Sequence, residues 1–318
     1  MAELIATRAA YGKALAELGE KHQDVVVLDA DLSKSTMTYE FAKKFPERFV
    51  QMGISEQDMM ATAAGIATMG KKVFASTFAI FAAGRAYDQV RNSIAYPRLD
   101  VKVCATHAGL SVGEDGASHQ MIEDLALMRV VPGMTVLCPS DAASTRWAVE
   151  AAYEHHGPVY VRLGRAPVPQ YHGEDSRFGI GKGVVLRKGS DVSVIACGML
   201  LGPALEAAEI LSTEGISAGV IDMVSIKPLD EALVLEEAAR CGAIVTAEEH
   251  NIIGGLGGAV AEAVTSSRPV PVIRVGVKDT FGESGKPEQL MVKYGLAASD
   301  IVAAARRAIA MKATPLVP

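Results

Sequence analysis

The chain has 318 residues, of which 49% are apolar, and it carries a formal net charge of −6. This length and apolar content leave room for two domains with buried cores. The acidic balance and the lack of a Lys/Arg run argue against a nucleic-acid partner, and no apolar stretch approaches the roughly 20 residues that span a bilayer. We therefore expect a cytoplasmic protein with neither a nucleic-acid nor a membrane partner.

The first half of the chain alternates short apolar runs with amphipathic stretches. Apolar runs without polar interruption are typical of buried parallel strands, and strands alternating with helices indicate a parallel sheet covered by helices. We expect one such domain over residues 1–165. Its predicted strands are 25–28, 49–52, 73–78, 101–106, 135–138 and 159–163, and its predicted helices are 7–18, 38–44, 56–69, 81–94, 122–128 and 142–155.

Clustered Pro and Gly interrupt this alternation over residues 166–190, which we interpret as an inter-domain linker. The alternation then resumes and predicts a second domain over 191–318. The expected fold class is α/β, with two open parallel-sheet domains of three layers each. The predicted strands of the second domain are 192–196, 218–221, 243–246 and 272–275, and its predicted helices are 203–213, 230–240, 256–265, 287–294 and 299–310.

One carboxylate stands at the start of a predicted helix. Ser55 is the expected N-cap, which places Glu56 in the first turn, near the positive end of the helix dipole. Such a carboxylate is most often solvated. Its apolar neighbours Ile54, Met59 and Met60 favour instead a shielded group that takes part in proton transfer.

Two further groups of residues follow predicted strands. Phe78 and Phe81 lie three residues apart in a chain with only 5% aromatic residues; this spacing is more often core than a platform for a cofactor. The Gly-rich loop 107–120 is long enough to indicate a functional loop. It holds two histidines and two acids, but their spacing matches no metal pattern, so we predict no metal site in this chain.

A second Gly-rich segment, residues 254–258, follows a strand and opens a predicted helix, as a dinucleotide-binding loop would. Its spacing is not GxGxxG, and we interpret it as tight packing of a helix on a strand. The four cysteines lie far apart without a CxxC pair, so we expect free, buried thiols.

Taken together, these segments resemble transketolase, a thiamine-diphosphate enzyme. The resemblance covers essentially the whole chain and implies the second half of that enzyme, a pyrimidine-binding domain followed by the C-terminal domain. The segments that carry it are Gly53-Ile54-Ser55-Glu56, Thr77-Phe78-x-x-Phe81, Ala105-Thr106-His107, Gly113-Glu114-Asp115-Gly116-x-x-His119-Gln120 and Asp279-Thr280-Phe281-Gly282-Glu283-Ser284-Gly285.

The resemblance implies a cofactor-binding set. Glu56 matches the glutamate that hydrogen-bonds the aminopyrimidine ring, where it sets the tautomer with which the cofactor activates itself. Phe78 and Phe81 match the aromatics that line the pyrimidine pocket. Asp31 and Leu32, at a polar strand exit, are also expected at the cofactor.

One position departs from the family near this pocket. Gly84 stands where the family often has a tyrosine, so we expect either a wider pocket or another group in that space.

The resemblance also implies a substrate-binding set. His107, Asp115 and His119 match sugar-contacting positions, and the two histidines are expected to act in catalysis as well. Arg8, Arg165 and Ser35 match a phosphate-binding group, and a guanidinium suits a phosphate through paired hydrogen bonds.

The family's Gly-Asp-Gly segment, which binds Mg²⁺ and the diphosphate, does not occur in this sequence. The resemblance therefore implies that these ligands lie on a separate N-terminal subunit. We expect a dimer of heterodimers, a heterotetramer, which shares thiamine diphosphate and Mg²⁺ between its subunits. It would transfer a two-carbon ketol unit between sugar phosphates of pentose phosphate metabolism.

Three alternatives stay open. A 1-deoxyxylulose-5-phosphate synthase-like chain or a 2-oxoacid dehydrogenase beta-type subunit would share the Glu56 segment, although the Thr106-His107 pair favours transketolase. A non-catalytic partner-binding subunit would keep the fold alone. The presence of Glu56 together with the sugar-contacting set argues against it.

Overall fold

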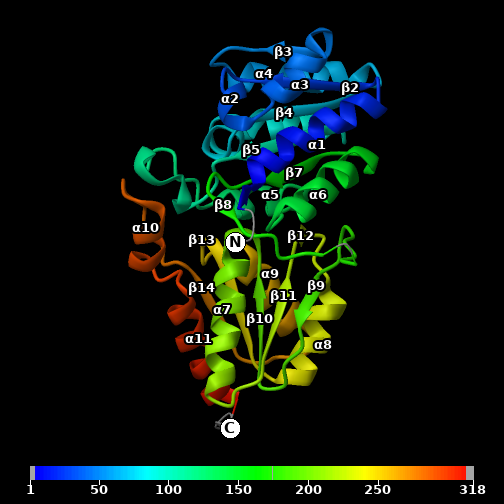
Figure 1. Cartoon of the computed structure of the whole chain (residues 1–318). Helices are drawn as coiled ribbons and strands as arrows, with labels where there is room; N and C mark the ends of the chain where they lie inside the picture. The colour runs from blue at the N-terminus through cyan, green and yellow to red at the C-terminus, as the bar shows by residue number, and fades with distance from the viewer. Residues whose placement is uncertain (1–3, 174, 313–318) are drawn as a thin grey trace.

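The computed structural model describes residues 4–173 and 175–312 and has two lobes stacked end to end (Figure 1). The N-terminal lobe is built on a seven-stranded sheet in the order β12-β6-β7-β5-β4-β2-β3, and the C-terminal lobe on a five-stranded sheet in the order β14-β13-β10-β11-β9. One edge strand of each sheet, β12 and β9, is antiparallel, and the other pairs are parallel. The predicted α/β class with two open sheets is confirmed, with an antiparallel edge added to each.

The N-terminal lobe follows the predicted alternation of strands and helices. Helices α1, α3 and α6 lie together on one face of its sheet, and α4 and α5 cover the other. Both faces are therefore shielded, which is why its central strands are apolar throughout. The elements are β1 (Ile5–Ala6), α1 (Thr7–Lys21), β2 (Val25–Asp29), α2 (Ser33–Thr36), α3 (Tyr39–Lys44), β3 (Phe49–Gln51), α4 (Glu56–Thr68), β4 (Lys72–Phe78), β5 (Val101–Thr106), α5 (Asp124–Val130), β6 (Thr135–Leu137), α6 (Ala142–Glu154), β7 (Val159–Arg162) and β8 (Pro167–Val168).

The C-terminal lobe has the same layered design on a smaller scale. Helices α7 and α11 pack on one face of its sheet, and α8 and α9 on the other. Helix α10 lies instead beside the loop 107–120 of the other lobe. The elements are β9 (Val184–Arg187), β10 (Val192–Ala196), α7 (Leu201–Thr213), β11 (Ala218–Asp222), β12 (Ser225–Lys227), α8 (Glu231–Cys241), β13 (Ile244–Asn251), α9 (Leu256–Ser267), β14 (Val272–Val277), α10 (Pro287–Lys293) and α11 (Ala298–Lys312).

The two lobes are joined by more than the chain between them. Strand β12 follows β11 in sequence but pairs with β6 of the N-terminal sheet. The ammonium of Lys227, the last residue of β12, donates to the carbonyls of Arg129 at 2.7 Å and Val131 at 2.6 Å. Within residues 166–190, β8 pairs with β1 and β9 joins the C-terminal sheet. The boundaries at 165 and 190 stay predictions.

One predicted helix is wrong in type. The segment expected as an α-helix over 81–94 forms two π-helical stretches, Ile80–Arg85 and Gln89–Ala95. Their wider turns are closed by hydrogen bonds from the Ala86 amide to the Phe81 carbonyl and from the Tyr96 amide to the Arg91 carbonyl, both 3.0 Å. A π turn holds an extra residue and is frequent at functional sites. The first of these stretches contains Phe81, one of the two aromatic residues of the predicted pyrimidine pocket.

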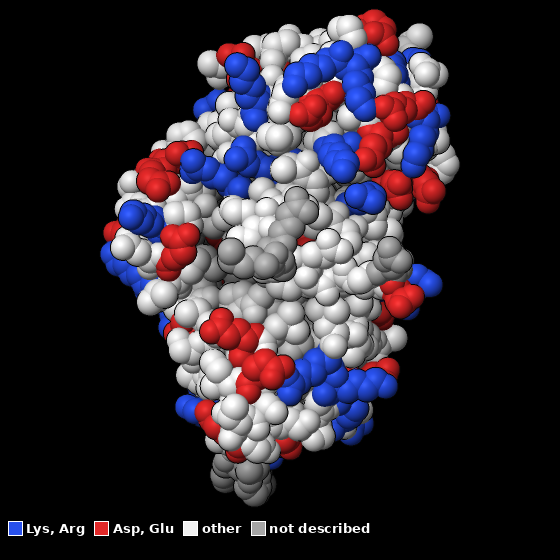
Figure 2. All heavy atoms as spheres, viewed as in Figure 1, with Lys and Arg blue, Asp and Glu red and all other residues white. Residues whose placement is uncertain are grey.

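The surface carries both signs of charge. Figure 2 shows Lys and Arg interspersed with Asp and Glu over the N-terminal lobe on the face in view. Among the described residues, no helix is long and apolar enough to cross a membrane. All four cysteines are free and buried, as expected.

Arg162 of β7 is a buried cation of the N-terminal lobe, and its ion pair generates a prediction. The Arg162 Nε donates to Asp124 Oδ2 at 2.8 Å, and both side chains are almost fully buried. Asp124→Asn leaves the guanidinium without its counter-charge, so we expect the free energy of unfolding to fall by about 3–5 kcal/mol. Urea unfolding followed by circular dichroism measures the change.

The matched control for this prediction is the partly exposed pair of Arg306 and Glu214. Glu214→Ala should change the free energy of unfolding by less than about 1 kcal/mol, because solvent screens exposed pairs. Equal effects of the two substitutions would contradict the role given to the buried pair.

Candidate active site

The predicted site residues follow strands that end at the same edge of the N-terminal sheet. Strands β2, β4, β5 and β7 are parallel neighbours, and their registers align Asp29 with Ser76, Phe78 with Thr106, and Ala105 with Arg162. The segments that leave these strands therefore emerge side by side, as at the carboxyl edge of other open α/β sheets.

An aromatic cluster forms at this edge. The rings of Phe78 and His107 stack with centroids 3.8 Å apart, and Phe81 lies 6.0 Å from Phe78. His119 meets Phe81 edge-on at 5.6 Å. Two of the predicted cofactor residues and both predicted histidines are thus in one cluster.

His107 occupies an uncommon backbone conformation in this cluster. Its φ of 57° lies in the left-handed region, which costs energy for a non-glycine residue and is found most often at functional sites. Thr106 Oγ1 lies 2.9 Å from His107 Nδ1 and fixes the ring. Burial, reinforced by the nearby Arg8, Arg165 and His119, lowers the pKa of His107 to about 3. The imidazole is therefore neutral, and it can donate or accept a hydrogen bond without adding a charge.

Glu56 begins helix α4 as predicted, and its side chain is only 2% exposed. Ser55 occupies the N-cap position, as expected, but its side chain makes no capping hydrogen bond. The partner of Glu56 is Arg85, whose Nη1 lies 2.9 Å from Glu56 Oε2. The same guanidinium lies over the Phe81 ring, 4.3 Å from its centroid.

The sequence reasoning missed Arg85. Arg85 is the last residue of the first π-helical stretch, and this stretch places its side chain against Glu56 and Phe81. No local sequence pattern predicts a π-helical turn. Gly84 itself is exposed, and a Cβ at this position would meet only Ile80 Cδ1, at 3.8 Å. The space expected beside Gly84 is therefore open, while the neighbouring Arg85 covers the Phe81 ring.

The predicted phosphate-binding residues form a second group. Arg8 Nη1 donates to the Ser35 carbonyl at 2.7 Å, and the Arg8 amide approaches the Gly164 carbonyl at 3.4 Å. Burial and the charge of Arg165 both lower the pKa of Arg8. Arg165 also forms an ion pair with Asp115 at 3.6 Å. Two guanidinium groups near each other and near His107 make a site suited to an anion.

Asp31 and Leu32 leave the neighbouring strand β2. The Asp31 amide donates to Gln51 Oε1 and the Leu32 amide to Asp29 Oδ1, both at 2.6 Å. Asp31 has a φ of 62° and an exposed side chain. These contacts fix the loop at the sheet edge, one strand from Phe78.

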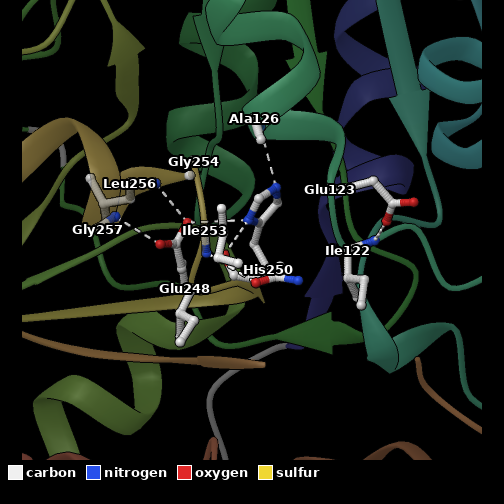
Figure 3. A network of polar contacts seen from close by, with 12 residues as sticks. Ile122, Glu123, Ala126, Glu248, His250, Ile253, Gly254, Leu256 and Gly257 are labelled. Atoms are coloured by element: carbon white, nitrogen blue, oxygen red, sulfur yellow. Dashed lines mark hydrogen bonds and ion pairs between the residues drawn. The ribbon is translucent and has the colours of Figure 1, made fainter. Parts of the chain in front are cut away.

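The second Gly-rich segment is already satisfied from within the protein. Figure 3 shows the Glu248 carboxylate directed at the start of helix α9, where it accepts from the Leu256 amide at 2.6 Å and the Gly257 amide at 2.7 Å. A Cβ on Gly255 would lie 2.0 Å from Glu248 Oε2. A buried carboxylate takes the amides that a phosphate would use, so the packing interpretation is confirmed.

The site fits the pyrimidine part of thiamine diphosphate. A hollow of about 430 Å³ is lined by Glu56, Arg85 and the neighbours of Glu56. A buried carboxyl group at its wall, with Arg85 connecting it to the Phe81 ring, suits a heterocycle with a ring nitrogen. Among residues 4–173 and 175–312, no group of three or more His, Cys, Asp or Glu side chains could hold a metal ion.

Comparison with known proteins places this geometry in a family. Residues 3–170 match the family described as "Transketolase, pyrimidine binding domain", and residues 181–301 match "Transketolase, C-terminal domain". The chain belongs to the transketolase family. The match favours transketolase over the other two thiamine-diphosphate alternatives.

Several relatives have the same extent as this chain. A "Putative transketolase C-terminal section" of Methanocaldococcus jannaschii is 50% identical over 292 residues, covering 91% of this chain and 92% of that protein. A solved structure described as "Split gene transketolase, inactive beta4 tetramer" is 58% identical, with a TM-score of 0.91, and covers 97% of this chain and 99% of that one. Human transketolase is 41% identical over 313 residues, which are 97% of this chain but only 50% of the human protein. The chain thus corresponds to the second half of a transketolase.

The neutral state of His107 can be tested. We expect its imidazole resonance, assigned with His107→Gln, not to titrate between about pH 5 and 8 in the folded chain, whereas in urea it should titrate near pH 6.5. Because the folded pKa lies below the unfolded one, the unfolded state binds more protons below about pH 6.5. His107 therefore lowers stability as the pH falls, by up to about 1.4 kcal/mol per pH unit.

His107→Gln should remove this part of the acid sensitivity, which urea unfolding at several pH values measures. A resonance that titrates above about pH 5 in the folded chain, or an unchanged dependence of stability on pH in the variant, would contradict the assignment.

Proposed function

We propose that this chain is the pyrimidine-binding subunit of a two-chain, thiamine-diphosphate-dependent transketolase of the cytoplasm. The enzyme transfers a two-carbon ketol unit from a ketose phosphate to an aldose phosphate of pentose phosphate metabolism. A separate N-terminal subunit supplies the diphosphate and Mg²⁺ ligands, and the assembly is a dimer of heterodimers. The observation that carries the proposal is the buried Glu56 carboxylate, which Arg85 links to the aromatic cluster of Phe78, Phe81 and His107 by an ion pair and by lying over the Phe81 ring.

Four residues of this chain are proposed to contact the cofactor, each with its own role. Bound thiamine diphosphate supplies the carbon nucleophile. Glu56 holds a proton at the pyrimidine ring nitrogen, and Phe78 and Phe81 orient the ring plane. Arg85 contacts the same carboxyl group, with its Nη1 2.9 Å from Glu56 Oε2. Arg85 therefore joins the cofactor-binding set.

The substrate groups include the two histidines of the aromatic cluster. Neutral His107 and the edge-on His119 offer hydrogen-bonding nitrogens for sugar hydroxyls, and Asp115 adds an acceptor. Arg8 and Arg165, with Ser35 beside Arg8, attract the phosphate. A sugar phosphate that lies across these groups presents its carbonyl end to the cofactor.

The first experiment tests whether the cofactor site is shared. Calorimetry with thiamine diphosphate and Mg²⁺ should detect no binding by this chain alone, because its residues face only the pyrimidine. Binding should appear when a partner chain with a Gly-Asp-Gly segment is added. Tight Mg²⁺-dependent binding by this chain alone would overturn the two-chain proposal.

The second experiment separates an enzyme subunit from a non-catalytic partner-binding subunit. Glu56→Ala and Glu56→Gln should each lower transketolase activity of the assembled complex by about 10²-fold or more, because proton-transfer help of this kind is worth roughly 10²–10⁴-fold. The assembly, measured by light scattering, should stay intact. An unchanged rate in an intact complex would refute the role of Glu56.

A further inference from the structure

The loop 107–120, which carries the predicted sugar-contacting residues, is held by the C-terminal lobe. Glu249 at the end of β13 is 1% exposed. Its Oε1 accepts from the Ser111 amide at 2.5 Å, and its Oε2 lies 3.3 Å from Ser111 Oγ. One carboxylate of the second lobe thus takes two donors from the first turn of the loop.

The contact between the loop and this carboxylate is direct. Gly109 has a φ of 84°, and a Cβ at this position would lie 2.3 Å from the Glu249 carboxyl carbon. The loop backbone therefore rests on the carboxylate with no room for a side chain. Further along the loop, Gln120 Nε2 donates to the Glu283 carbonyl at 2.9 Å, and Ser284 Oγ donates to the Glu114 carbonyl at 2.6 Å.

We propose that Glu249 is a positioning residue of the active site, through which the C-terminal lobe fixes the loop that presents Asp115 and His119 to the substrate. The inference rests on the proposed function, since it gives the loop its role in sugar binding. Glu249 does not touch the predicted cofactor residues. It acts through Ser111, four residues before Asp115.

The charge of Glu249 is set by groups from several elements. Burial raises its pKa to about 6, against the lowering effects of the Arg162 charge and the two Ser111 donors, and Asp124 raises it further. The folded pKa lies above the ordinary value, so the folded state binds more protons between about pH 4.5 and 6, and stability falls as the pH rises through that range. The ionised carboxylate is therefore kept at a cost in stability, which is typical of groups retained for function.

The neighbouring Glu248 provides a matched control. It is equally buried, at 1% exposure, and also takes two donors, but these are the backbone amides of Leu256 and Gly257 in helix α9 rather than the amide and hydroxyl of Ser111 in the loop (Figure 3). Substitutions at 248 and 249 thus remove neighbouring buried carboxylates that bind different elements, helix α9 in one case and the loop in the other.

The experiment compares Glu249→Met, Glu249→Gln and Glu248→Gln in the full chain and in the complex with its partner. Glu249→Met removes both acceptors at similar volume, so amide hydrogen exchange over 109–120 should speed up, and KM for the sugar phosphate should rise about tenfold or more. Glu249→Gln keeps one acceptor without the charge, and we expect a rise of about threefold. Thiamine-diphosphate affinity of the complex should not change.

A merely structural role of Glu249 would change stability and substrate binding together, whereas a positioning role separates them. Glu249→Gln should be at least as stable as the natural chain at about pH 8, because it mimics the protonated carboxyl, and yet bind substrate more weakly. Glu248→Gln should lower the melting temperature without changing loop exchange or KM. Unchanged loop exchange and KM in Glu249→Met, or equal shifts in both for Glu248→Gln, would overturn the proposal.

The two proposals fail in different ways. If the complex of the unsubstituted chain with its partner had no transketolase activity, the proposed function would be refuted. Hydrogen exchange of the chain would still decide whether Glu249 fixes the loop.

Discussion

The neutralisation of one buried cation, Arg162, links the parts of this molecule. Its Nε pairs with Asp124 Oδ2 at 2.8 Å, and its Nη2 donates to the carbonyls of Glu249 at 2.9 Å and Met121 at 3.4 Å. These groups belong to the N-terminal sheet, helix α5, the end of the site loop and the C-terminal lobe. A guanidinium removed from water needs such partners to compensate its lost hydration. The Arg162 guanidinium therefore connects the two lobes through the Glu249 carbonyl and also holds Met121, the residue that follows the site loop.

Polar residues near the end of β13 contact elements of both lobes. Glu248, Glu249 and His250 are consecutive and all buried. The pairing of β13 with β14 shifts register over these residues. Glu248 accepts from helix α9, and His250 Nε2 accepts from the Ala126 amide of helix α5 at 3.3 Å (Figure 3). Glu249 faces the site loop. Three adjacent polar residues thus connect one strand to three other elements.

The sequence predicted the sheet edge well because strand signals are local. Apolar runs identified the strands, and parallel pairing then required the residues after them to meet, as Phe78 and His107 do. Two side-chain contacts could not be predicted in this way. The pairing of Arg85 with Glu56 follows a π-helical stretch, which hydrophobic spacing does not distinguish from an α-helix. The contact of Glu249 with Ser111 joins residues 138 apart in the chain. A polar run after a predicted strand was the available signal for Glu249, but only the packing of the lobes identifies its partner.

The charged groups of the site are already paired within this single chain. Glu56 contacts Arg85, Arg165 contacts Asp115, and Arg8 donates to the Ser35 carbonyl. The Arg165–Asp115 pair is partly exposed on both sides, at 35% and 36%, and such a pair contributes only about 0–1 kcal/mol. Replacing it with a ligand group therefore costs little. The Glu56–Arg85 pair differs, because Arg85 is 47% exposed whereas Glu56 is only 2% exposed. Arg85 therefore keeps this buried carboxyl group from being left without a partner, and any group that displaces Arg85 has to take over that contact.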